Sequence, residues 1–339
     1  MFWFFLFITL AVVLWGELYP IRKLKVNDCG KPKEPKNPKG ESFVLHLHTI
    51  YSYDSLGKPQ EIERTAKTLG VGKVFATDHE NDLINRCHQS EIIVGGVETD
   101  HPEYGRILKI GETIVLTHPD NPKYPWRGKF ERGFYYEIIN LKDAIKRAPL
   151  RLKAYFVARS LLIYPFSREA ALKFFPKLIP LERWIKLYLK RTGGTLPIAG
   201  GLDHHVKLTL WEKPKKSYSF PPYADGFFIL QNKTFGEKAE NALRTGRFYL
   251  SLCGETLEVE ENKIYIKGKA LFFNHKCDGV SINTCGEVEE GTLLVAVYRY
   301  LFRLGDYYFG LRPAALFIPP DRVSQILNGN KQPPSAGGT

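Results

Sequence analysis

The sequence has few cysteines and no pair of them in a metal-binding spacing. Its five cysteines stand at positions 29, 87, 253, 277 and 285, and none forms a C-x-x-C motif. A zinc site built on thiolates is therefore not expected. Free buried thiols are the simplest state for these residues. Cys277 and Cys285 would pair across adjacent strands only if the body of the protein lies outside the cytoplasm.

The chain also lacks a recognised nucleic-acid-binding motif, although its formal net charge is +12. Residues 142–191 carry 13 Lys or Arg against 3 Asp or Glu, so most of the excess lies in one segment. Aromatic and aliphatic residues are interleaved with the basic ones, and four prolines divide the segment into short helices. Three interpretations are open: amphipathic helices with solvated lysines, a basic surface on anionic lipid, or a lid that attracts anionic substrate. Nucleic acid fits the charge, but no motif supports it.

No charged side chain interrupts the first 16 residues, which are almost wholly apolar. With the residues up to Ile21 the stretch is long enough to span a bilayer, and no small-x-small cleavage site follows it. We expect an uncleaved single-pass membrane anchor over residues 1–21; a buried core helix is the alternative. Arg22, Lys23 and Lys25 favour a cytoplasmic body, but long domains translocate despite such charges, so the side of the catalytic domain stays open.

Two histidines end the first apolar stretch after this anchor. Residues 43–48 alternate, so His46 and His48 lie on the same side of a predicted strand, with Asp54 in the loop just beyond. Two imidazoles and a nearby carboxylate form a compact ligand set for a divalent ion. We expect both histidines at a wet cleft. The alternative is a strand whose polar face happens to carry two histidines.

Metal-ligand residues recur at the ends of four further apolar runs. In a parallel α/β barrel the carboxyl ends of the strands converge on one face, where active sites lie. A helix predicted over Pro59–Leu69, with Gly70 at its left-handed exit, completes a strand–helix–strand unit of such a fold. One such ending arises by chance, but five are hard to explain by core packing. The four further endings are Asp78-His79, Glu98, His118 and Asp203-His204-His205.

The order and spacing of these motifs resemble the PHP (polymerase and histidinol phosphatase) family. The shared elements are H-x-H with an aspartate six residues on, T-D-H, a strand-end glutamate, T-H-P and G-x-D-x-H, over residues 42–254. The resemblance implies a distorted (β/α)7 TIM-like barrel of class α/β, a two- or three-metal site and phosphoester hydrolysis. The Gly-Arg-x-Tyr-x-Ser segment at 246–251 is similar to the carbaryl-hydrolase-like (CehA/McbA-type) branch, in which it leads into a small β domain.

By motif position, the resemblance also implies a ligand set. The ligands of the first two metals would be the catalytic residues: His46, His48, Glu98, His118 and Asp203. The first metal would be bound by His46, His48, Glu98 and Asp203, the second by Glu98 and His118, and a third by Asp54, His79 and His205. The D-x-H spacing favours His205 over His204, and Asp78 would orient a neighbouring ligand. The second site is incomplete, because no histidine lies between His118 and His204. Asn140 or water would fill it.

The expected chemistry follows from these ligands. Two cations about 3.5 to 4 Å apart can generate a hydroxide and clamp phosphoryl oxygens. Imidazoles tolerate Mn, Fe and Zn, and carboxylates offset the charge, so two or three such divalent ions are the expected cofactors. Asn140 ends a strand that resembles the family's Glu-x-x-Asn strand. Lys123 and Arg127 follow His118 closely and are candidates for substrate binding, with solvated surface residues as the alternative.

The expected organisation has five parts. They are an anchor at 1–21, a spacer at 22–41, the hydrolase domain at 42–254 with a basic helical insert at 142–191, a small β-sandwich-like module at 255–318, and a disordered tail at 319–339. The expected function is that of a membrane-anchored metal-dependent phosphoesterase that acts on a phosphoester substrate. Two alternatives stay open: a hydrolase of another ester or amide, and a noncatalytic metal-binding module.

Overall fold

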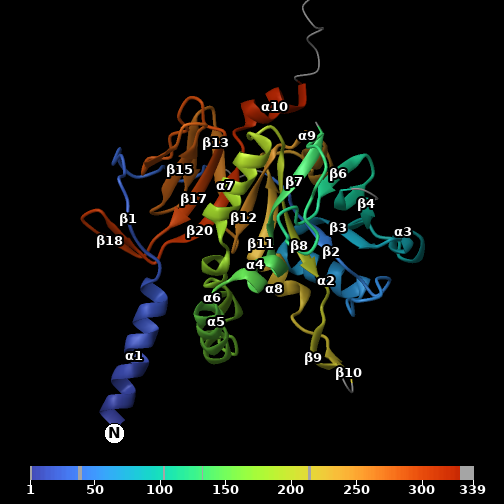
Figure 1. Cartoon of the computed structure of the whole chain (residues 1–339), viewed down its shortest axis with the longest axis horizontal. Coiled ribbons are helices and arrows are strands. Elements are labelled where there is room, and N and C mark those ends of the chain that lie inside the picture. Colours follow the sequence, from blue (N-terminus) through green and yellow to red (C-terminus); the bar gives the residue numbers. More distant parts are fainter. Residues whose placement is uncertain (1, 37–39, 102–103, 132, 213–214, 329–339) are drawn as a thin grey trace, which may run out of the picture.

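A closed barrel of seven strands forms the centre of the computed structural model, which describes residues 2–36, 40–101, 104–131, 133–212 and 215–328 (Figure 1). The barrel closes because its last strand pairs with its first. The strands are β2 (Ser42–Leu47), β3 (Val71–His79), β4 (Ile93–His101), β5 (Gly105–Ile110), β6 (Thr113–Leu116), β7 (Phe134–Asn140) and β8 (Ile198–His204). All neighbours pair in parallel except β5, which is antiparallel to β4 and β6. The expected α/β barrel is confirmed, with β5 as a strand that the sequence did not reveal.

Short helices cover the barrel. The helix α2 (Pro59–Leu69) begins and ends as predicted, with proline in its first turn and Gly70 at a φ of +66°. It buries Ile62 and Ala66 against the strands. The basic segment is divided at its prolines, as expected. The other helices of the body are α3 (Leu83–Cys87), α4 (Leu141–Arg147), α5 (Leu150–Ile163), α6 (Arg168–Leu172), the 3₁₀ turn η1 (Phe175–Leu178), α7 (Leu181–Thr192), α8 (Tyr223–Ile229) and α9 (Ala239–Thr245).

The C-terminal strands continue the sheet of the barrel. The start of β2 pairs with β11, and from β11 the sheet runs on through five further antiparallel strands. The expected β-sandwich-like module is therefore not a separate sandwich. A second apolar core, with Phe272 and Phe317 at its centre, lies under the hairpin of β13 (Leu257–Glu260) and β14 (Lys263–Ile266). The strands are β11 (Leu230–Thr234), β12 (Phe248–Leu252), β20 (Arg312–Phe317), β17 (Leu294–Arg299), β15 (Leu271–His275) and β16 (Val280–Asn283).

The segment expected to be a spacer lies against these strands instead. β1 (Ile21–Lys23) pairs with β19 (Tyr307–Phe309), which pairs with β18 (Phe302–Leu304). Farther along, Asn27 forms a bridge with Asn283, and Cys29 forms a disulfide with Cys285. The pairing of Cys277 with Cys285 is thus wrong. Cys277 and Cys87 are exposed free thiols, whereas Cys253 is a buried one.

The N-terminal helix α1 spans Phe2–Leu18 and extends away from the body (Figure 1). In the described part of the chain, no helix combines the length and the hydropathy needed to cross a membrane, so the expected transmembrane helix is not confirmed. At the other terminus, α10 (Pro320–Asn328) is ordered where a disordered tail was expected, and residues 329–339 lie outside the described residues.

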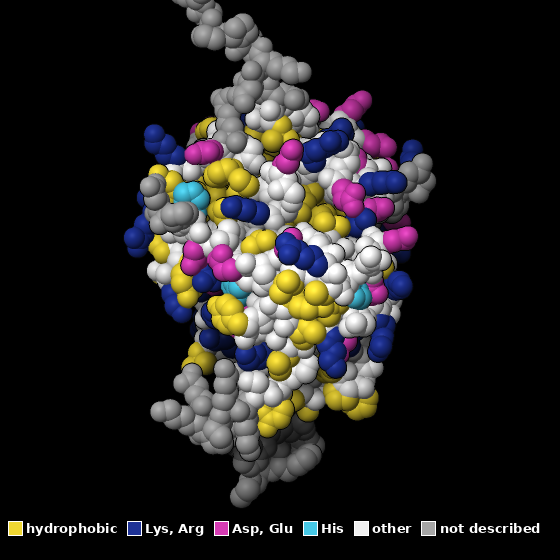
Figure 2. Space-filling model, turned by 90° about the vertical axis from the view of Figure 1, so that its right-hand side faces the viewer, with side chains coloured by type: hydrophobic (Ala, Val, Ile, Leu, Met, Phe, Trp, Pro, Cys, Tyr) yellow, Lys and Arg dark blue, Asp and Glu magenta, His cyan; other side chains and the backbone are white. Residues whose placement is uncertain are grey.

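Two further elements, α5 and a β-hairpin, lie at the same end of the molecule as α1 in Figure 1. The hairpin of β9 (Leu208–Glu212) and β10 (Lys215–Tyr218) follows β8, and in the view of Figure 1 it extends downward, as α1 and α5 do. Figure 2 shows a side face of the molecule, on which acidic side chains lie mainly in the upper half, Lys and Arg occur in both halves, and hydrophobic side chains gather in the lower half. On this face the lower half is therefore the more apolar and the less acidic one.

Candidate metal centre

The backbone is irregular at three of the predicted ligands. The register of β2 against β3 and β8 shifts between Leu45 and Leu47, and His46, between them, has a φ of +58°. His118 and Asp203 have φ values of +33° and +48°. Residues other than glycine rarely adopt such values, and where they do, the strain is held by the surrounding structure, often at functional sites. Three predicted ligands thus lie at strained positions at the carboxyl end of the barrel.

Glu98, near the end of β4, is the centre of the ligand set. Its Oε2 lies 3.3 Å from Nε2 of His48 and 3.6 Å from Nε2 of His46. Asp203, at the end of β8, completes this group, because its Oδ1 lies 3.9 Å from Nε2 of both histidines. The structure therefore brings together the four residues expected at the first metal.

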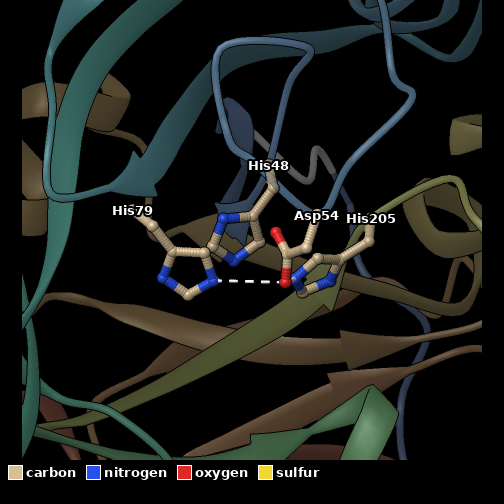
Figure 3. Close-up of side chains that lie close together, drawn as sticks. All are labelled: His48, Asp54, His79 and His205. Atoms are coloured by element: carbon tan, nitrogen blue, oxygen red, sulfur yellow. Dashed lines mark ion pairs between the residues drawn. The ribbon is translucent and has the colours of Figure 1, made fainter.

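A second cluster, drawn in Figure 3, shares His48 with the first. Oδ2 of Asp54 lies 3.4 Å from Nε2 of His79 and 3.0 Å from Nε2 of His205. The ring of His48 stacks between them, with centroids 4.5 Å from His79 and 4.1 Å from His205. In each of two clusters the ligand atoms lie within 4.8 Å of one another. The clusters are His48, Asp54, His79 and His205, and His46, His48 and Glu98.

The donor atoms of the first group fit a divalent cation. Nε2 of His46 and Nε2 of His48 are buried and find no hydrogen-bond partner among the described residues. An unpaired buried polar atom costs about 1–3 kcal/mol, so two of them aimed at one carboxylate need a compensating partner. A mixed set of imidazoles and carboxylates is suited to Mn, Fe or Zn. Both side chains are fully buried, so the expected wet cleft is wrong for these two residues.

The electrostatics also favour a cation. Burial opposes protonation of His46, but the carboxylates of Glu137, Asp203 and Glu98 outweigh it and raise its pKa well above the usual value. Burial lowers the pKa of His48 to about 3, so this ring is neutral near pH 7. Despite burial, the pKa values of Glu98 and Asp203 are lowered, first by His46. The negative potential of the cluster therefore attracts a positive charge.

Glu137, in β7, is the main supporting residue that the sequence did not assign. Its Oε1 lies 2.6 Å from Nδ1 of His46, and its Oε2 accepts a hydrogen bond of 2.5 Å from the backbone N–H of His118. A hydrogen bond at Nδ1 orients the ring so that Nε2 faces Glu98. Gly201 lies directly beside this carboxylate, and a Cβ there would collide with Oε1 of Glu137. The G-G-x-D segment thus leaves room for the orienting side chain.

Asn140 supports the carboxylate of Glu137. Its Nδ2 donates to Oε2 of Glu137 at 3.1 Å, and its Oδ1 accepts from the backbone N–H of Asp143, which caps α4. The amide is thus engaged on both sides. Its Nδ2 also lies 3.5 Å from Oδ2 of Asp203, so its expected roles at the second metal and at the substrate stay predictions.

Two further expectations concern neighbours of the ligands. Asp78 accepts hydrogen bonds from the backbone N–H and the hydroxyl of Thr49, at 2.6 and 2.7 Å. It therefore fixes the loop that leads to Asp54 and does not orient a histidine. Nε2 of His204 lies 2.9 Å from the carbonyl oxygen of Pro221, and burial lowers the pKa of this imidazole to about 4. His205, not His204, lies in the cluster, as the D-x-H spacing predicts.

A guanidinium group lies beside the two residues expected at the second metal. Nε2 of His118 lies 3.5 Å from Oε1 of Glu98, and Nη1 of Arg106 lies 3.7 Å from the same oxygen. Arg106 is held there by Asp100, at 2.7 Å, and by the ring of Tyr124, at 4.3 Å. Neither cluster found in the described residues includes His118. Arg106 lies on β5, the strand that the sequence did not reveal, so this cation was missed.

A cavity of about 490 Å³ opens beside the ligands. Asp54, His79, Glu98, His118 and Asp203 line it. Lys123 lies in its wall, as predicted, whereas Arg127 is exposed and is not among the lining residues. The cavity carries five cationic side chains in all, of which four were not predicted as site residues. The five are Arg106, Lys123, Lys142, Lys146 and Arg147.

Comparisons with known proteins give little further information. No family model and no curated protein matches the chain. Among solved structures, a two-domain protein from Bacteroides vulgatus ATCC 8482, described as containing a predicted PHP-like metal-dependent phosphoesterase, is 10% identical; the match covers 82% of this chain and 94% of that chain, with a TM-score of 0.33. Similarity at this level establishes neither a shared fold nor a shared activity. The function of this chain must be argued from its own residues.

Proposed function

We propose that this protein is a metal-dependent phosphoesterase of the PHP type. The observation that carries the proposal is the convergence of the predicted ligands at one end of a seven-stranded barrel, beside a cavity lined by cations. Glu137 adds the carboxylate that orients His46, and Gly201 leaves the space that this carboxylate needs.

Two ions are favoured over three. His46, His48, Glu98 and Asp203 would hold one ion, and Asp54, His79 and His205 would hold the other. Bound there, divalent ions would supply Lewis acidity toward a phosphoryl oxygen and make water a nucleophile at neutral pH. Arg106 and His118 would contribute positive charge and a hydrogen-bond donor where the second metal was expected, beside Glu98.

The cationic wall favours a phosphoester over a neutral ester or amide. Lys142 lies closest to the ligands, with Nζ 2.9 Å from Oδ1 of Asp203. Lys146, Arg147 and Lys123 extend the positive charge along the cavity. Once bound ions offset the ligand carboxylates Asp54, Glu98 and Asp203, these cations would leave the wall net positive and concentrate anionic substrates. A neutral substrate would gain nothing from this arrangement, whereas a phosphomonoester dianion would.

A substrate panel with metal control tests the proposal. The chain is stripped of metal, repleted with Mn, Fe or Zn, and assayed on p-nitrophenyl phosphate, bis(p-nitrophenyl) phosphate, p-nitrophenyl acetate and an anilide. We expect metal-dependent hydrolysis of a phosphate ester. Asp54→Asn should lower kcat/KM by about 100-fold or more, the scale of losing an electrostatic stabiliser. The control Asp82→Asn, at an exposed position before α3, should leave it unchanged.

Three outcomes would contradict the proposal. Turnover of the acetate or anilide alone would identify a carboxylic ester or amide hydrolase. Metal binding without turnover of any substrate would identify a noncatalytic module. Hydrolysis of phosphate esters by metal-free protein would remove the metal from the account.

A further inference from the structure

The outer face of α5 is apolar and has no partner in the body. Leu150, Val157, Leu161 and Leu162 are 79%, 54%, 73% and 72% exposed, and Phe166, just beyond the helix, is 91% exposed. Positions 150, 154, 157, 158 and 161 follow helical spacing, and all of them are apolar. Single exposed apolar residues are ordinary on a protein surface, but a continuous stripe of this exposure marks an interaction site.

α5 is also the element that fixes α1 to the body. Nε of Arg159 lies 2.6 Å from Oε1 of Glu17, and the hydroxyl of Tyr155 donates to the carbonyl of Val13 at 3.2 Å. Lys177, in η1, donates to the carbonyl of Glu17 at 2.7 Å. α1 itself presents apolar side chains, because Phe7 is 69% exposed and the residues from Val12 to Leu14 are nearly half exposed. The two unpartnered apolar surfaces therefore lie on adjacent elements.

The junction of these helices has the composition of a membrane–water interface. Trp15 stacks on Tyr19 at 5.6 Å and meets Tyr155 edge to face at 6.2 Å. The guanidinium of Arg151 lies 5.8 Å from the ring of Trp15 and 5.4 Å from that of Tyr19. Trp and Tyr concentrate at the headgroup level of bilayers, and basic side chains there are attracted to anionic lipids. A protein partner would not require this combination.

The mouth of the metal centre lies at the same end of the molecule. α4 starts directly after the last residue of β7, and the β9–β10 hairpin follows β8, so both mark the carboxyl end of the barrel. Figure 1 shows them at the end from which α1 and α5 extend, and the lower half of the face in Figure 2 is the more apolar and less acidic one. Tyr53, in the wall of the cavity, is 79% exposed.

We propose that this end of the protein docks on a bilayer of anionic lipids, with α5 lying in the headgroup layer beside α1 and the cavity mouth turned toward the membrane. Burial of the α5 stripe would supply hydrophobic free energy, and Arg151 and Lys153 would meet lipid phosphates. The basic segment thus serves two purposes. Its α4 end lines the cavity, and its α5 end contacts lipid.

Site-specific labels on the full chain test the proposal without any turnover, so its failure is distinguishable from failure of the proposed function. Cys87 and Cys277 are replaced by Ser, which leaves the disulfide and the buried Cys253. A fluorophore is then attached at Leu161→Cys, at Tyr53→Cys, or at Val280→Cys as the matched control, since Val280 is 48% exposed on the C-terminal strands. The protein is incorporated into vesicles of phosphatidylglycerol and phosphatidylcholine with a nitroxide at the headgroup.

We expect a blue shift and strong quenching at position 161, quenching at position 53, and neither at position 280. Vesicles of phosphatidylcholine alone, or high salt, should weaken the signal at 161. Equal signals at 161 and 280 would overturn the docking of α5, even if α1 enters the lipid. A signal at 161 without one at 53 would overturn the orientation of the mouth. A concentration-dependent blue shift at 161 in the absence of lipid would assign the stripe to a second copy of the chain instead.

Discussion

The barrel and the C-terminal strands share one sheet but differ in how their polar groups are arranged. In the C-terminal part, Arg299 forms bonds of 3.1 and 2.7 Å with the two oxygens of Glu255, and Asn283 both donates to the carbonyl of Glu287 and accepts from the backbone N–H of Gly286. Buried atoms without a partner among the described residues occur in both parts, but those of the C-terminal strands belong to no metal-type cluster there. At the carboxyl end of the barrel, by contrast, Nε2 of His46 and Nε2 of His48 lie beside the same carboxylate, that of Glu98. Several such groups gathered around one carboxylate indicate a binding site.

The shared sheet explains how the two parts cooperate. β2 pairs at its start with β11, through Ser42 and Phe43, and at its end with β8, through Leu47. The strand that carries His46 is therefore fixed at one end by the C-terminal strands and at the other by the barrel. The C-terminal part supports the site without contributing any of the predicted ligands. Substitutions in the barrel and in the C-terminal strands should therefore differ in their effects on turnover and on stability.

The largest effect is expected from the double substitution His46→Ala and His48→Ala. It should abolish turnover, a loss of about 1000-fold or more, because the first ion loses two of its four proposed ligands. It should also lower stability, since removal of His46 leaves the carboxylate of Glu137 buried without its partner, at a cost of about 3–5 kcal/mol. His48→Ala alone, which removes a neutral ring, should keep the fold and lose the same turnover. Steady-state rates at saturating metal, with thermal melting, provide the measurement.

Wild-type turnover in either variant would remove the proposed mechanism. A collapse of thermal stability in His48→Ala would instead point to a structural metal.

A smaller effect, on stability alone, is expected from Phe272→Ala. This side chain is fully buried in the core of the C-terminal strands, and its removal should lower the free energy of unfolding by about 3–5 kcal/mol. Below the unfolding transition, kcat/KM on a phosphate ester should be unchanged, because the site lies in the barrel. Urea unfolding and initial rates test both statements. A large fall in kcat/KM of the folded variant would show that the C-terminal strands shape the site directly.

The smallest effect is expected from Lys123→Gln, which should raise KM about fivefold, from the loss of up to roughly 1 kcal/mol of screened attraction. Arg127→Gln, the matched control outside the cavity, should leave KM unchanged. The difference should shrink at high salt. Equal effects of the two substitutions would mean that net charge, and not the cavity wall, attracts the substrate.

Local signals in the sequence were sufficient for much of the barrel. Pro59 and Gly70 bound α2, and alternating apolar residues that end in His, Asp or Glu identified the strands whose ends converge. Most of the candidate ligands could be predicted because they lie at or near the carboxyl ends of barrel strands, as His46, Glu98 and Asp203 do. Barrel topology then brings residues together that are more than 150 positions apart.

Features that depend on tertiary pairing could not be predicted in this way. β5 is short and antiparallel, so Arg106 carried no recognisable signal. The disulfide joins residues separated by 256 positions, which spacing alone cannot indicate. The charge count of the basic segment also did not reveal the apolar stripe on α5, because Arg159 of this helix is engaged with Glu17 of α1 while Val157 and Leu161 are exposed.

Metal content tests the central claim most directly. The purified chain is stripped, repleted with Mn, Fe and Zn, passed through a desalting column and analysed for its elements, with His48→Ala as the variant and Val280→Ser as the control. The account predicts at least two divalent ions per wild-type or control chain and a clear loss in His48→Ala, because His48 belongs to both clusters. Fewer than one ion per wild-type chain after repletion would contradict it.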